Sequence, residues 1–194
     1  MWRRRKCSSG VSSPTRERAA EIVDRIRAMA TRGTVRQSEF ELADIVKESM
    51  AFLQHEFDVQ DVNVSLDLDN GLPMVAGDRT QLQQVLVNLL TNALQELTSS
   101  GIIQKRIGIR IELVDAKVVS CIIEDSGPGI DPEHLPHLFD SFFTTKESGM
   151  GLDLPIAQSI IESLGGRIWA DNQSTLGGAR FAFELPISLP ETNH

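Results

Sequence analysis

Cysteine is scarce in this chain. The 194 residues contain only Cys7 and Cys121, which lie 114 positions apart. Neither has a histidine or a second cysteine nearby at a metal-ligand spacing, and two distant thiols do not make a disulfide framework. The sequence therefore indicates neither a zinc site nor a disulfide-stabilised secreted protein, and we expect a reducing, cytoplasmic setting.

Long hydrophobic runs are also missing. No run approaches the roughly 18 apolar residues that a membrane span requires. The first fourteen residues are basic, but no apolar stretch follows them, which excludes a secretory signal. Hydrophobic residues still make up 41% of the chain and are spread along it, so the chain can bury a core.

Most of the chain lacks positive charge. The formal net charge is −8, yet residues 1–18 carry +5 and residues 19–194 carry −13. A nucleic-acid-binding surface on the body of the protein is therefore not expected. We interpret residues 1–14 as a disordered basic arm, with a polybasic anchor on anionic lipid as the alternative.

An amphipathic helix is predicted next. Apolar residues recur at three- and four-residue steps between Thr15 and Arg32, and Gly33 follows them. A helix with one apolar and one charged face packs on another helix, of the same chain or of a partner. We assign residues 15–36 to this helix and a linker.

Residues 38–187 mix strand and helix patterns. We expect a short strand near Phe40 and strands over 62–68, 107–113, 118–123, 167–171 and 179–185. Helices are expected over 42–57, from Asp78 or Thr80 to Leu97, and over 152–164. Strict alternation of strand and helix is missing, so we predict an α+β fold: a two-layer sandwich whose mixed sheet is covered on one face by about three helices. Residues 188–194 form a tail.

Two asparagines mark the long central helix. Asn88 and Asn92 lie four residues apart, and therefore on one helix face. Each offers a carbonyl oxygen to a hard cation and an NH₂ group to a phosphate oxygen. Asparagine is only a middling helix former, so two of them among leucines indicate a function, although polar residues flanking the apolar stripe would look the same.

An acidic turn follows the strand that ends near Ile123. Its sequence is Glu-Asp-Ser-Gly-Pro-Gly-Ile, residues 124–130. A carboxylate at a buried strand end can accept a hydrogen bond from an exocyclic amine, and glycines let the backbone approach a ring or a phosphate. A plain tight turn explains the glycines equally well, but it does not require the acidic residue.

A third segment, residues 142–152, leads into a helix. Gly149 and Gly151 loosen the backbone where helix amides point outward and form an anion site, and Lys146 adds a positive charge for phosphate. A glycine-containing surface loop is the alternative.

In this order the three segments resemble the ATP-binding catalytic domain of sensor histidine kinases, within the superfamily that includes DNA gyrase, MutL and the large heat-shock chaperones. The resemblance covers about residues 38–187 and is nearest to oxygen-sensing and dicarboxylate-sensing kinases, whose lid reads Phe-Phe-Thr-Thr-Lys. It implies an α/β sandwich that binds ATP and Mg²⁺.

The resemblance also assigns roles. Asn88 is expected to hold Mg²⁺, Asn92 to touch phosphate and Asp125 to accept the adenine amine. Asn88 and Lys146 are the expected catalytic residues. The nucleotide-binding residues that the resemblance implies are Asn88, Asn92, Asp125, Gly127, Gly129, Ile130, Phe139, Thr144, Thr145, Lys146, Gly149, Met150, Gly151 and Leu152.

The chain departs from the family pattern in its histidines. The family phosphorylates a histidine on a two-helix dimerisation domain, and helix 15–32 resembles only the second half of that hairpin. None of His55, His134, His137 and His194 lies in the expected helix. We therefore expect that this chain does not phosphorylate itself. His134 and His137 are interpreted as scaffolding of the lid.

A second departure is Asp153, where the family usually has glycine. A carboxylate near a triphosphate would be repulsive, by roughly 1 kcal/mol at 4 Å in water. The alternative is that Asp153 caps the following helix. A third departure is Arg180, which lies in the last glycine-containing motif of the family, residues 177–181 of this chain. We assign it no role.

Two functions remain in view. The first is the catalytic part of a two-component sensor kinase, which transfers the γ-phosphoryl group of ATP to a histidine on another segment and signals to a response regulator receiver domain. The alternative is a degenerate nucleotide-binding module that docks on a kinase or regulator without catalysis. Pairing of two copies of the chain is left open.

Overall fold

A computed structural model describes residues 38–69, 71–146 and 149–188 of the protein. Contacts between Cα atoms divide the chain into two units, Met1–Val35 and Arg36–His194, and every described residue belongs to the second. The expectations for the basic arm, for helix 15–32 and for residues 189–194 concern residues outside the described part.

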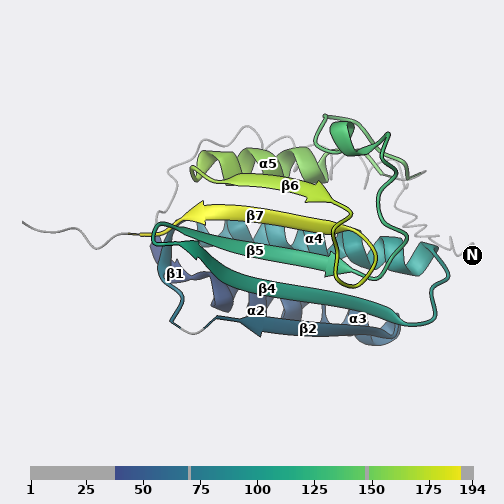
Figure 1. Cartoon of the computed structure of the whole chain (residues 1–194), viewed down its shortest axis with the longest axis horizontal. Coiled ribbons are helices and arrows are strands. Elements are labelled where there is room, and N and C mark those ends of the chain that lie inside the picture. The colour runs from purple at the N-terminus through teal and green to yellow at the C-terminus, as the bar shows by residue number, and fades with distance from the viewer. Residues whose placement is uncertain (1–37, 70, 147–148, 189–194) are drawn as a thin grey trace, which may run out of the picture. The chain divides into compact units, whose positions relative to one another are not determined.

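Five strands form the main sheet, in the order β2-β4-β5-β7-β6 (Figure 1). The strands are β2 (Val62–Leu68), β4 (Lys105–Asp115), β5 (Val118–Asp125), β6 (Arg167–Asp171) and β7 (Arg180–Pro186). β2 and β4 are parallel, and the other neighbours are antiparallel. This mixed sheet confirms the predicted fold class, and each predicted strand is present to within two residues at its ends.

A small second sheet was only half predicted. β1 (Ser38–Glu41) matches the strand expected near Phe40, whereas its antiparallel partner β3 (Met74–Gly77) was not expected. Val75 of β3 also bridges to Ile187, just after β7. A four-residue strand is too short to show a period, and its partners lie far away in the sequence.

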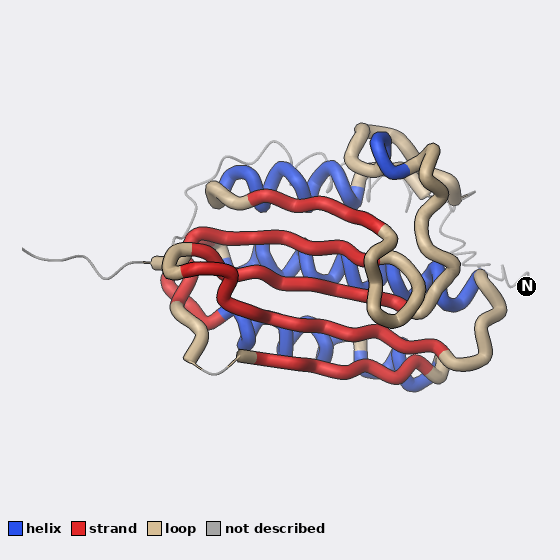
Figure 2. Tube along the Cα trace, viewed as in Figure 1, coloured by secondary structure: helices blue, strands red, loops and turns tan. Residues whose placement is uncertain are grey.

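Helices cover one face of the main sheet, which leaves the other face uncovered by helices (Figure 2). They are α2 (Leu42–Phe52), α3 (Gln54–Val59), α4 (Arg79–Ser99) and α5 (Asp153–Ser163), with a short 3₁₀ turn at Leu135–His137. The prediction of a single helix over 42–57 is wrong in one respect, because the helix breaks at Leu53. The break allows both Leu53 and Phe57 to be buried while Phe52 lies 69% exposed.

The core is built around α4. Its apolar stripe is buried throughout, at Leu82, Val85, Leu86, Leu89, Leu90, Ala93, Leu94 and Leu97. Burial of one such leucine contributes about 1.5–3 kcal/mol, so this face dominates the packing of the helix. Asp78, one of the two expected caps, begins the helix: its Oδ1 accepts hydrogen bonds from the amides of Thr80 at 2.9 Å and Gln81 at 3.2 Å.

Cys121 and Trp169 are parts of the sheet. Cys121 is fully buried on β5, and burial raises the pKa of its thiol to about 12. Trp169 of β6 is half-buried beneath the guanidinium of Arg167, at 5.0 Å from the ring centroid. Neither residue belongs to the site described below.

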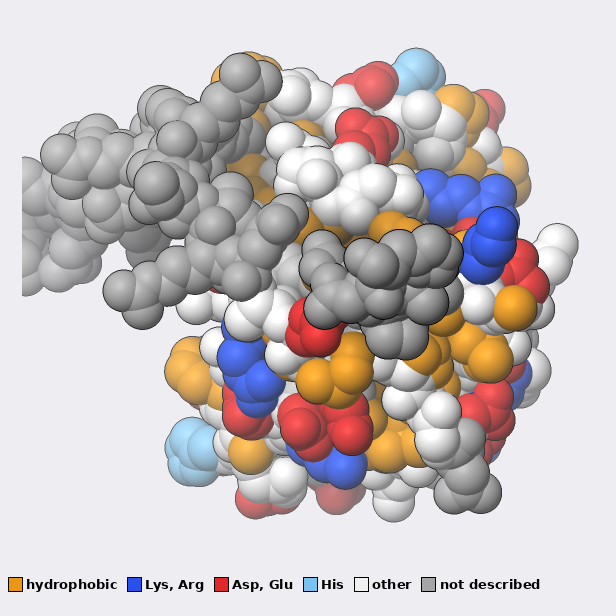
Figure 3. Space-filling view, turned by 90° about the vertical axis from the view of Figure 1, so that its left-hand side faces the viewer, with side chains coloured by type: hydrophobic (Ala, Val, Ile, Leu, Met, Phe, Trp, Pro, Cys, Tyr) orange, Lys and Arg blue, Asp and Glu red, His pale blue; other side chains and the backbone are white. Residues whose placement is uncertain are grey.

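The described surface has no single dominant charge on the end seen in Figure 3. Acidic and basic side chains alternate there with hydrophobic ones, and no continuous basic patch is visible among the coloured residues. Among the described residues, no helix is long and apolar enough to cross a membrane.

Candidate functional site

Asp125 ends the central strand β5 and is the most buried acidic residue of the site, at 2% exposure. Its Oδ1 accepts hydrogen bonds from the amides of Gly127 at 2.8 Å and Ala179 at 3.1 Å. Its other oxygen, Oδ2, accepts no hydrogen bond from the described residues. Oδ2 is not fully buried, since no fully buried side-chain oxygen or nitrogen of the described residues lacks a partner. One oxygen therefore holds the turn together, and the other remains for a donor from outside the chain.

The backbone packs closely around this carboxylate. Gly127 leaves no room for a Cβ, which would meet Asp125 Oδ1 at 2.7 Å. Gly178, from the loop before β7, donates its amide to the Asp125 carbonyl at 3.0 Å, and a Cβ there would meet the amide of Gly127 at 2.5 Å. Glycine is therefore required at both positions, because any side chain would push the two loops apart.

Burial sets the charge behaviour of Asp125. Desolvation raises the pKa of its carboxyl above the ordinary 3.8, the amides of Gly127 and Ala179 oppose the rise, and the negative charge of Glu96 adds to it. A buried carboxylate with a raised pKa and an unused oxygen is typical of a binding residue.

Two residues that received no role from the sequence organise the loop around Asp125. Asn172 forms a pair of hydrogen bonds with the backbone of Ile130, both 2.7 Å long. Glu124, 6% exposed, accepts from the amide and the hydroxyl of Thr175 at 2.9 and 2.8 Å. These contacts join segments more than 40 residues apart, which no local pattern reveals.

Arg180 also acquires a role. Its guanidinium donates to both carboxylate oxygens of Asp171, at 2.9 and 2.7 Å, and to Gln173 Oε1 at 3.0 Å. The pair joins β6 to β7 at the base of the loop that carries Asn172. Arg180 therefore supports the loop.

Asn88 lies on α4 against the start of α5. Its Nδ2 donates to the carbonyl oxygen of Asp153 at 3.3 Å. Because a carbonyl only accepts, the amide nitrogen must face it, and Asn88 Oδ1 points the other way, where it accepts no hydrogen bond from the described residues. That oxygen is available to a cation.

The capping hypothesis for Asp153 is wrong. α5 begins at Asp153 itself, and the N-cap position is Leu152, whose side chain makes no capping hydrogen bond. Asp153 is the acidic residue of the first turn, where the helix dipole favours negative charge.

Lys146 and Asn92 are brought together. The ammonium Nζ of Lys146 donates to Oδ1 of Asn92, which leaves the NH₂ group of Asn92 facing away from the lysine. The same ammonium reaches Gln95 Oε1 at 2.8 Å and Glu96 Oε1 at 3.2 Å, both on α4. The lysine is therefore held over the same helix that carries both asparagines.

A backbone hydrogen bond joins the two ends of the lid segment. The amide of Phe142 donates to the Gly151 carbonyl at 2.8 Å, and both residues have positive φ, at +68° and +63°. A Cβ on Gly151 would collide with the backbone of Phe142 and Phe143, so only glycine fits. Thr144 Oγ1 accepts the amide of Lys146 at 3.1 Å, and a Cβ on Gly149 would meet that oxygen at 2.6 Å.

The two lid histidines contact a phenylalanine, in agreement with a scaffolding role. The rings of His134 and His137 lie 5.5 and 6.0 Å from that of Phe143. His137 Nδ1 also pairs with Asp140 Oδ2 at 2.8 Å.

The other predicted binding residues fall into two groups. Leu152 is buried in the core, and Ile130, Phe139 and Met150 pack partly buried against it. Thr145 and Gly149 are exposed, and Gly129 adopts a φ of +79° beside Asn172. The apolar members therefore shape the walls of the site.

The polar residues line one stretch of α4. Gly127, next to Asp125, lies beside Leu97, since a Cβ there would be 3.9 Å from Leu97 Cδ2. Asn88 is nine residues earlier on the same helix, which is about 13 Å at 1.5 Å per residue. Asn92 and Lys146 lie between these two ends.

A separate apolar groove of about 510 Å³ lies between α3 and the last turns of α4. His55, exposed as expected, and Val59 and Leu94 contribute to its lining. It contains none of the predicted site residues, and we assign it no nucleotide.

Comparison with known proteins identifies the class. Residues 77–189 match the family described as histidine kinase-, DNA gyrase B- and HSP90-like ATPase. The chain belongs to this family of ATP-binding domains.

Individual relatives are sensor kinases. The chain is 37% identical over 171 residues to the sensor protein FixL of Bradyrhizobium diazoefficiens, and 33% identical over 171 residues to the C4-dicarboxylate transport sensor protein DctB of Rhizobium meliloti. These alignments cover 88% and 87% of this chain but only 33% and 26% of the relatives. The chain therefore spans about a third or less of these two proteins.

Solved structures agree. The catalytic domain of histidine kinase ThkA is similar with a TM-score of 0.69 and 31% identity, over 79% of this chain and 99% of that domain. The chain therefore has the fold and the family of a histidine kinase catalytic domain, as the resemblance in its motifs indicated.

Proposed function

We propose that the chain binds Mg-ATP and transfers the γ-phosphoryl group to a histidine on a dimerisation domain, as the catalytic part of a two-component sensor kinase. The observation that carries this proposal is the arrangement along α4. A buried carboxylate with one unused oxygen lies in the turn beside Leu97, and an asparagine with a free carbonyl oxygen lies about 13 Å earlier along the axis of α4. This separation suits a base at Asp125 and a triphosphate near Asn88.

At the base end, Asp125 Oδ2 accepts a hydrogen bond from the exocyclic amine of adenine. The hydrogen bond is charge-assisted and lies in a buried position, so it discriminates against bases that lack a donor there. The glycines at 127 and 178 let the backbone approach the ring.

At the phosphate end, Asn88 Oδ1 and the phosphate oxygens hold Mg²⁺. The described residues contain no cluster of three acidic, histidine or cysteine side chains, and Mg²⁺ needs only one or two protein ligands when phosphates and water complete its shell. The ion would neutralise charge on the phosphates. Asn92 Nδ2 donates to a phosphate oxygen, and Lys146 supplies a positive charge.

The chemistry is transfer and not hydrolysis. Family members that hydrolyse ATP carry a glutamate at the position of Asn88, and an asparagine amide is too weak a base to activate water. The bond between the γ-phosphorus and its bridging oxygen breaks, ADP leaves, and an imidazole nitrogen takes the phosphoryl group.

The acceptor histidine lies on a partner segment. Of the three described histidines, His134 and His137 are engaged with Phe143, and His55 lies away from the site on α3. A structure of ThkA in complex with the response regulator TrrA is similar over 95% of this chain, with a TM-score of 0.72 and 25% identity. This similarity supports a receiver domain as a further partner. Because the phosphoryl donor is ATP, we place the reaction in the cytoplasm.

The first test is calorimetric titration with a non-hydrolysable ATP analogue, with and without Mg²⁺. We expect Mg-dependent binding that Asn88→Ala abolishes and that Asn63→Ala, a matched change on the exposed edge strand β2, leaves intact. Binding that does not respond to Mg²⁺ or to Asn88→Ala would contradict the assignment.

The second test separates the kinase from a non-catalytic docking module. The chain is mixed with a separately supplied histidine-bearing dimerisation domain of a relative and with radiolabelled ATP. Labelled phosphohistidine that depends on Asn88 supports the kinase. Tight Mg-ATP binding without transfer to any relative's domain would favour the docking module.

A further inference from the structure

The ammonium group of Lys146 is surrounded by acceptors from one turn of α4. Asn92, Gln95 and Glu96 each place a side-chain oxygen within 3.2 Å of Nζ. Nζ donates hydrogen bonds to Asn92 and Gln95, and its contact with Glu96 is an ion pair. Only Glu96 carries a charge, and it lies outside the motifs that the sequence singled out.

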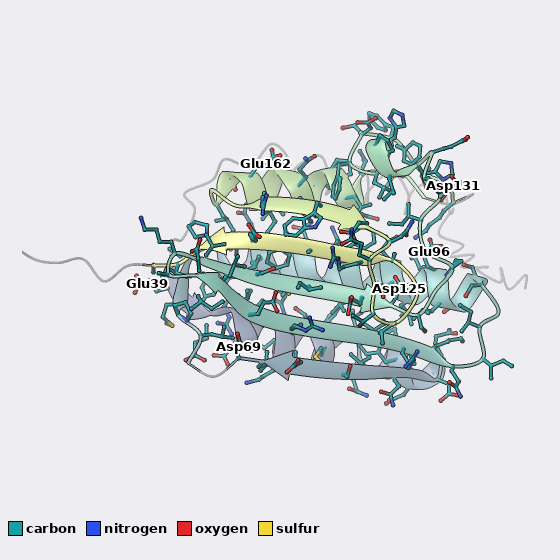
Figure 4. The ribbon with its side chains drawn as sticks, in the orientation of Figure 1. Glu39, Asp69, Glu96, Asp125, Asp131 and Glu162 are labelled. Carbon is teal, nitrogen blue, oxygen red and sulfur yellow. The ribbon has the colours of Figure 1, made fainter. Side chains whose placement is uncertain are left out.

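Glu96 also faces the base end of the site. Its charge raises the pKa of the Asp125 carboxyl, in addition to the larger effect of desolvation. Figure 4 shows both residues at the same end of the sheet. The ion pair of Lys146 and Glu96 therefore lies at the end of the molecule that carries Asp125.

We propose that Glu96 is a counter-ion that holds Lys146 on α4 and that the γ-phosphate of ATP must displace. This inference rests on the proposed function. Nζ already donates to Asn92 and Gln95 and pairs with the charge of Glu96, so a phosphate competes with Glu96 for the ammonium. Once the lysine leaves, the carboxylate of Glu96 stands unneutralised beside Asp125 and close to a polyanion. Glu96 is therefore a positioning residue that weakens ATP binding.

The dependence on phosphate number follows from this exchange. ATP carries the third phosphate that draws Lys146 away, whereas ADP leaves the lysine with Glu96. Removing the carboxylate should therefore strengthen ATP binding and leave ADP binding nearly unchanged. Simple repulsion between Glu96 and phosphates would strengthen both.

The test compares Glu96→Gln with the unmutated chain in titrations of Mg-ATP analogue and Mg-ADP. The pair is partly exposed, at 31% for Lys146 and 39% for Glu96. We expect roughly two- to fivefold tighter ATP binding, the range for a partly screened ion pair, and no change for ADP. Glu162→Gln, which removes the same charge from an exposed position on α5, is the control.

Lys146→Met completes a double-mutant cycle. If Glu96 acts through the lysine, Glu96→Gln has no effect on ATP binding in the Lys146→Met background. An equal gain in both backgrounds, or an equal gain for ADP, would overturn the proposal.

A measurement without nucleotide keeps the two proposals apart. The rate at which acetic anhydride acylates Lys146, followed by mass spectrometry of peptides, should rise in Glu96→Gln and stay constant in Glu162→Gln, because the amine is no longer held against a carboxylate. An unchanged rate would overturn the ion pair even if ATP binds. A raised rate without ATP binding by either protein would refute the nucleotide site, and with it the exchange, while leaving the contact itself established.

Discussion

Gly178 lies so close to Asp125 that no side chain fits between them. A Cβ at Gly178 would be 2.6 Å from the Asp125 carbonyl oxygen and closer still to Oδ1. The loop before β7 therefore fixes the position of the acidic residue at the end of β5.

Gly178→Ala should damage both the fold and the site. Overpacking a buried contact costs about 1–3 kcal/mol of unfolding free energy, and the displaced carboxylate should bind the ATP analogue more weakly. Urea unfolding and titration measure the two effects. Gly108→Ala is the control, since its Cβ would meet Leu176 at an ordinary 3.4 Å. Equal stability of the two variants would show that the loop yields.

Asp125→Asn should separate binding from stability. The asparagine Oδ1 can keep the hydrogen bonds from Gly127 and Ala179, while an NH₂ group replaces the oxygen that would accept from adenine. We expect the affinity for the ATP analogue to fall about ten- to a hundredfold, the loss of a hydrogen bond to a charged group.

The fold should tolerate this change. The folded-state pKa of Asp125 is raised, so the folded protein binds the proton more readily than the unfolded chain does. The ionised carboxylate therefore lowers the free energy of unfolding at a pH above the folded pKa. The protein regains this stability as the pH falls and the carboxyl group is protonated. The melting temperature at neutral pH should therefore be unchanged or higher. Asp67→Asn, an 82% exposed carboxylate, should alter neither property. A variant that binds ATP normally would remove Asp125 from the site.

Arg180→Ala should destabilise the chain in a pH-dependent way. Desolvation opposes ionisation of Asp171, but the hydrogen bonds from Arg180 and from the amide of Gln173 outweigh it, and the pKa of Asp171 lies below the ordinary 3.8. A carboxylate with a lowered pKa stabilises the fold above its unfolded pKa and ceases to do so as the pH falls through the folded pKa.

The loss should be about 1 kcal/mol at neutral pH, since both side chains are about three-quarters buried. It should vanish in acid, as urea unfolding over a pH series would show. Arg167→Ala, in a pair whose arginine is 72% exposed, should lose less. A loss that persists unchanged in acid would point to packing of the arginine stem instead of its charge.

Asp153→Asn tests the remaining hypothesis for this residue, which is that its carboxylate repels the phosphates. Its carbonyl contacts Asn88, so its carboxylate lies close to the phosphate end of the site. Removing the charge should strengthen ATP binding, by an amount that decreases with added salt. It should also cost about 0.3–1 kcal/mol of stability, because a first-turn carboxylate is lost. Weaker binding would mean that the carboxylate assists the cation and does not repel the phosphates.

The sequence predicted the parts of the fold that repeat locally. The apolar stripe of α4 and the alternation in β2 follow from periods of 3.6 and 2, and both are present. The strand β3 has four residues and pairs with a strand more than 30 positions away, so no period could reveal it. The break at Leu53 depends on how Phe57 packs, which local propensity does not encode.

The site divides in the same way. The asparagines, Asp125 and the lid glycines stand in recognisable motifs, and the structure places them around one stretch of α4. Asn172 and Glu96 contact partners 42 and 50 positions away, and each looks like an ordinary polar surface residue in the sequence. Arg180 stands out as a departure from the family pattern, but its pairing with Asp171 does not. Such roles become visible only when the chain is folded.

The small sheet has a mechanical consequence. Ser38 pairs with Gly77, the residue before the Asp78 cap of α4, and Val75 of the same strand is bridged to Ile187. The described domain thus begins and ends on one strand, at the end of the main sheet opposite Asp125 (Figure 4). A pull on the backbone at Ser38 would therefore reach the first turn of α4 directly, about 15 Å along that helix from Asn88. β3 therefore connects the first and last described strands of the domain with the helix that carries Asn88.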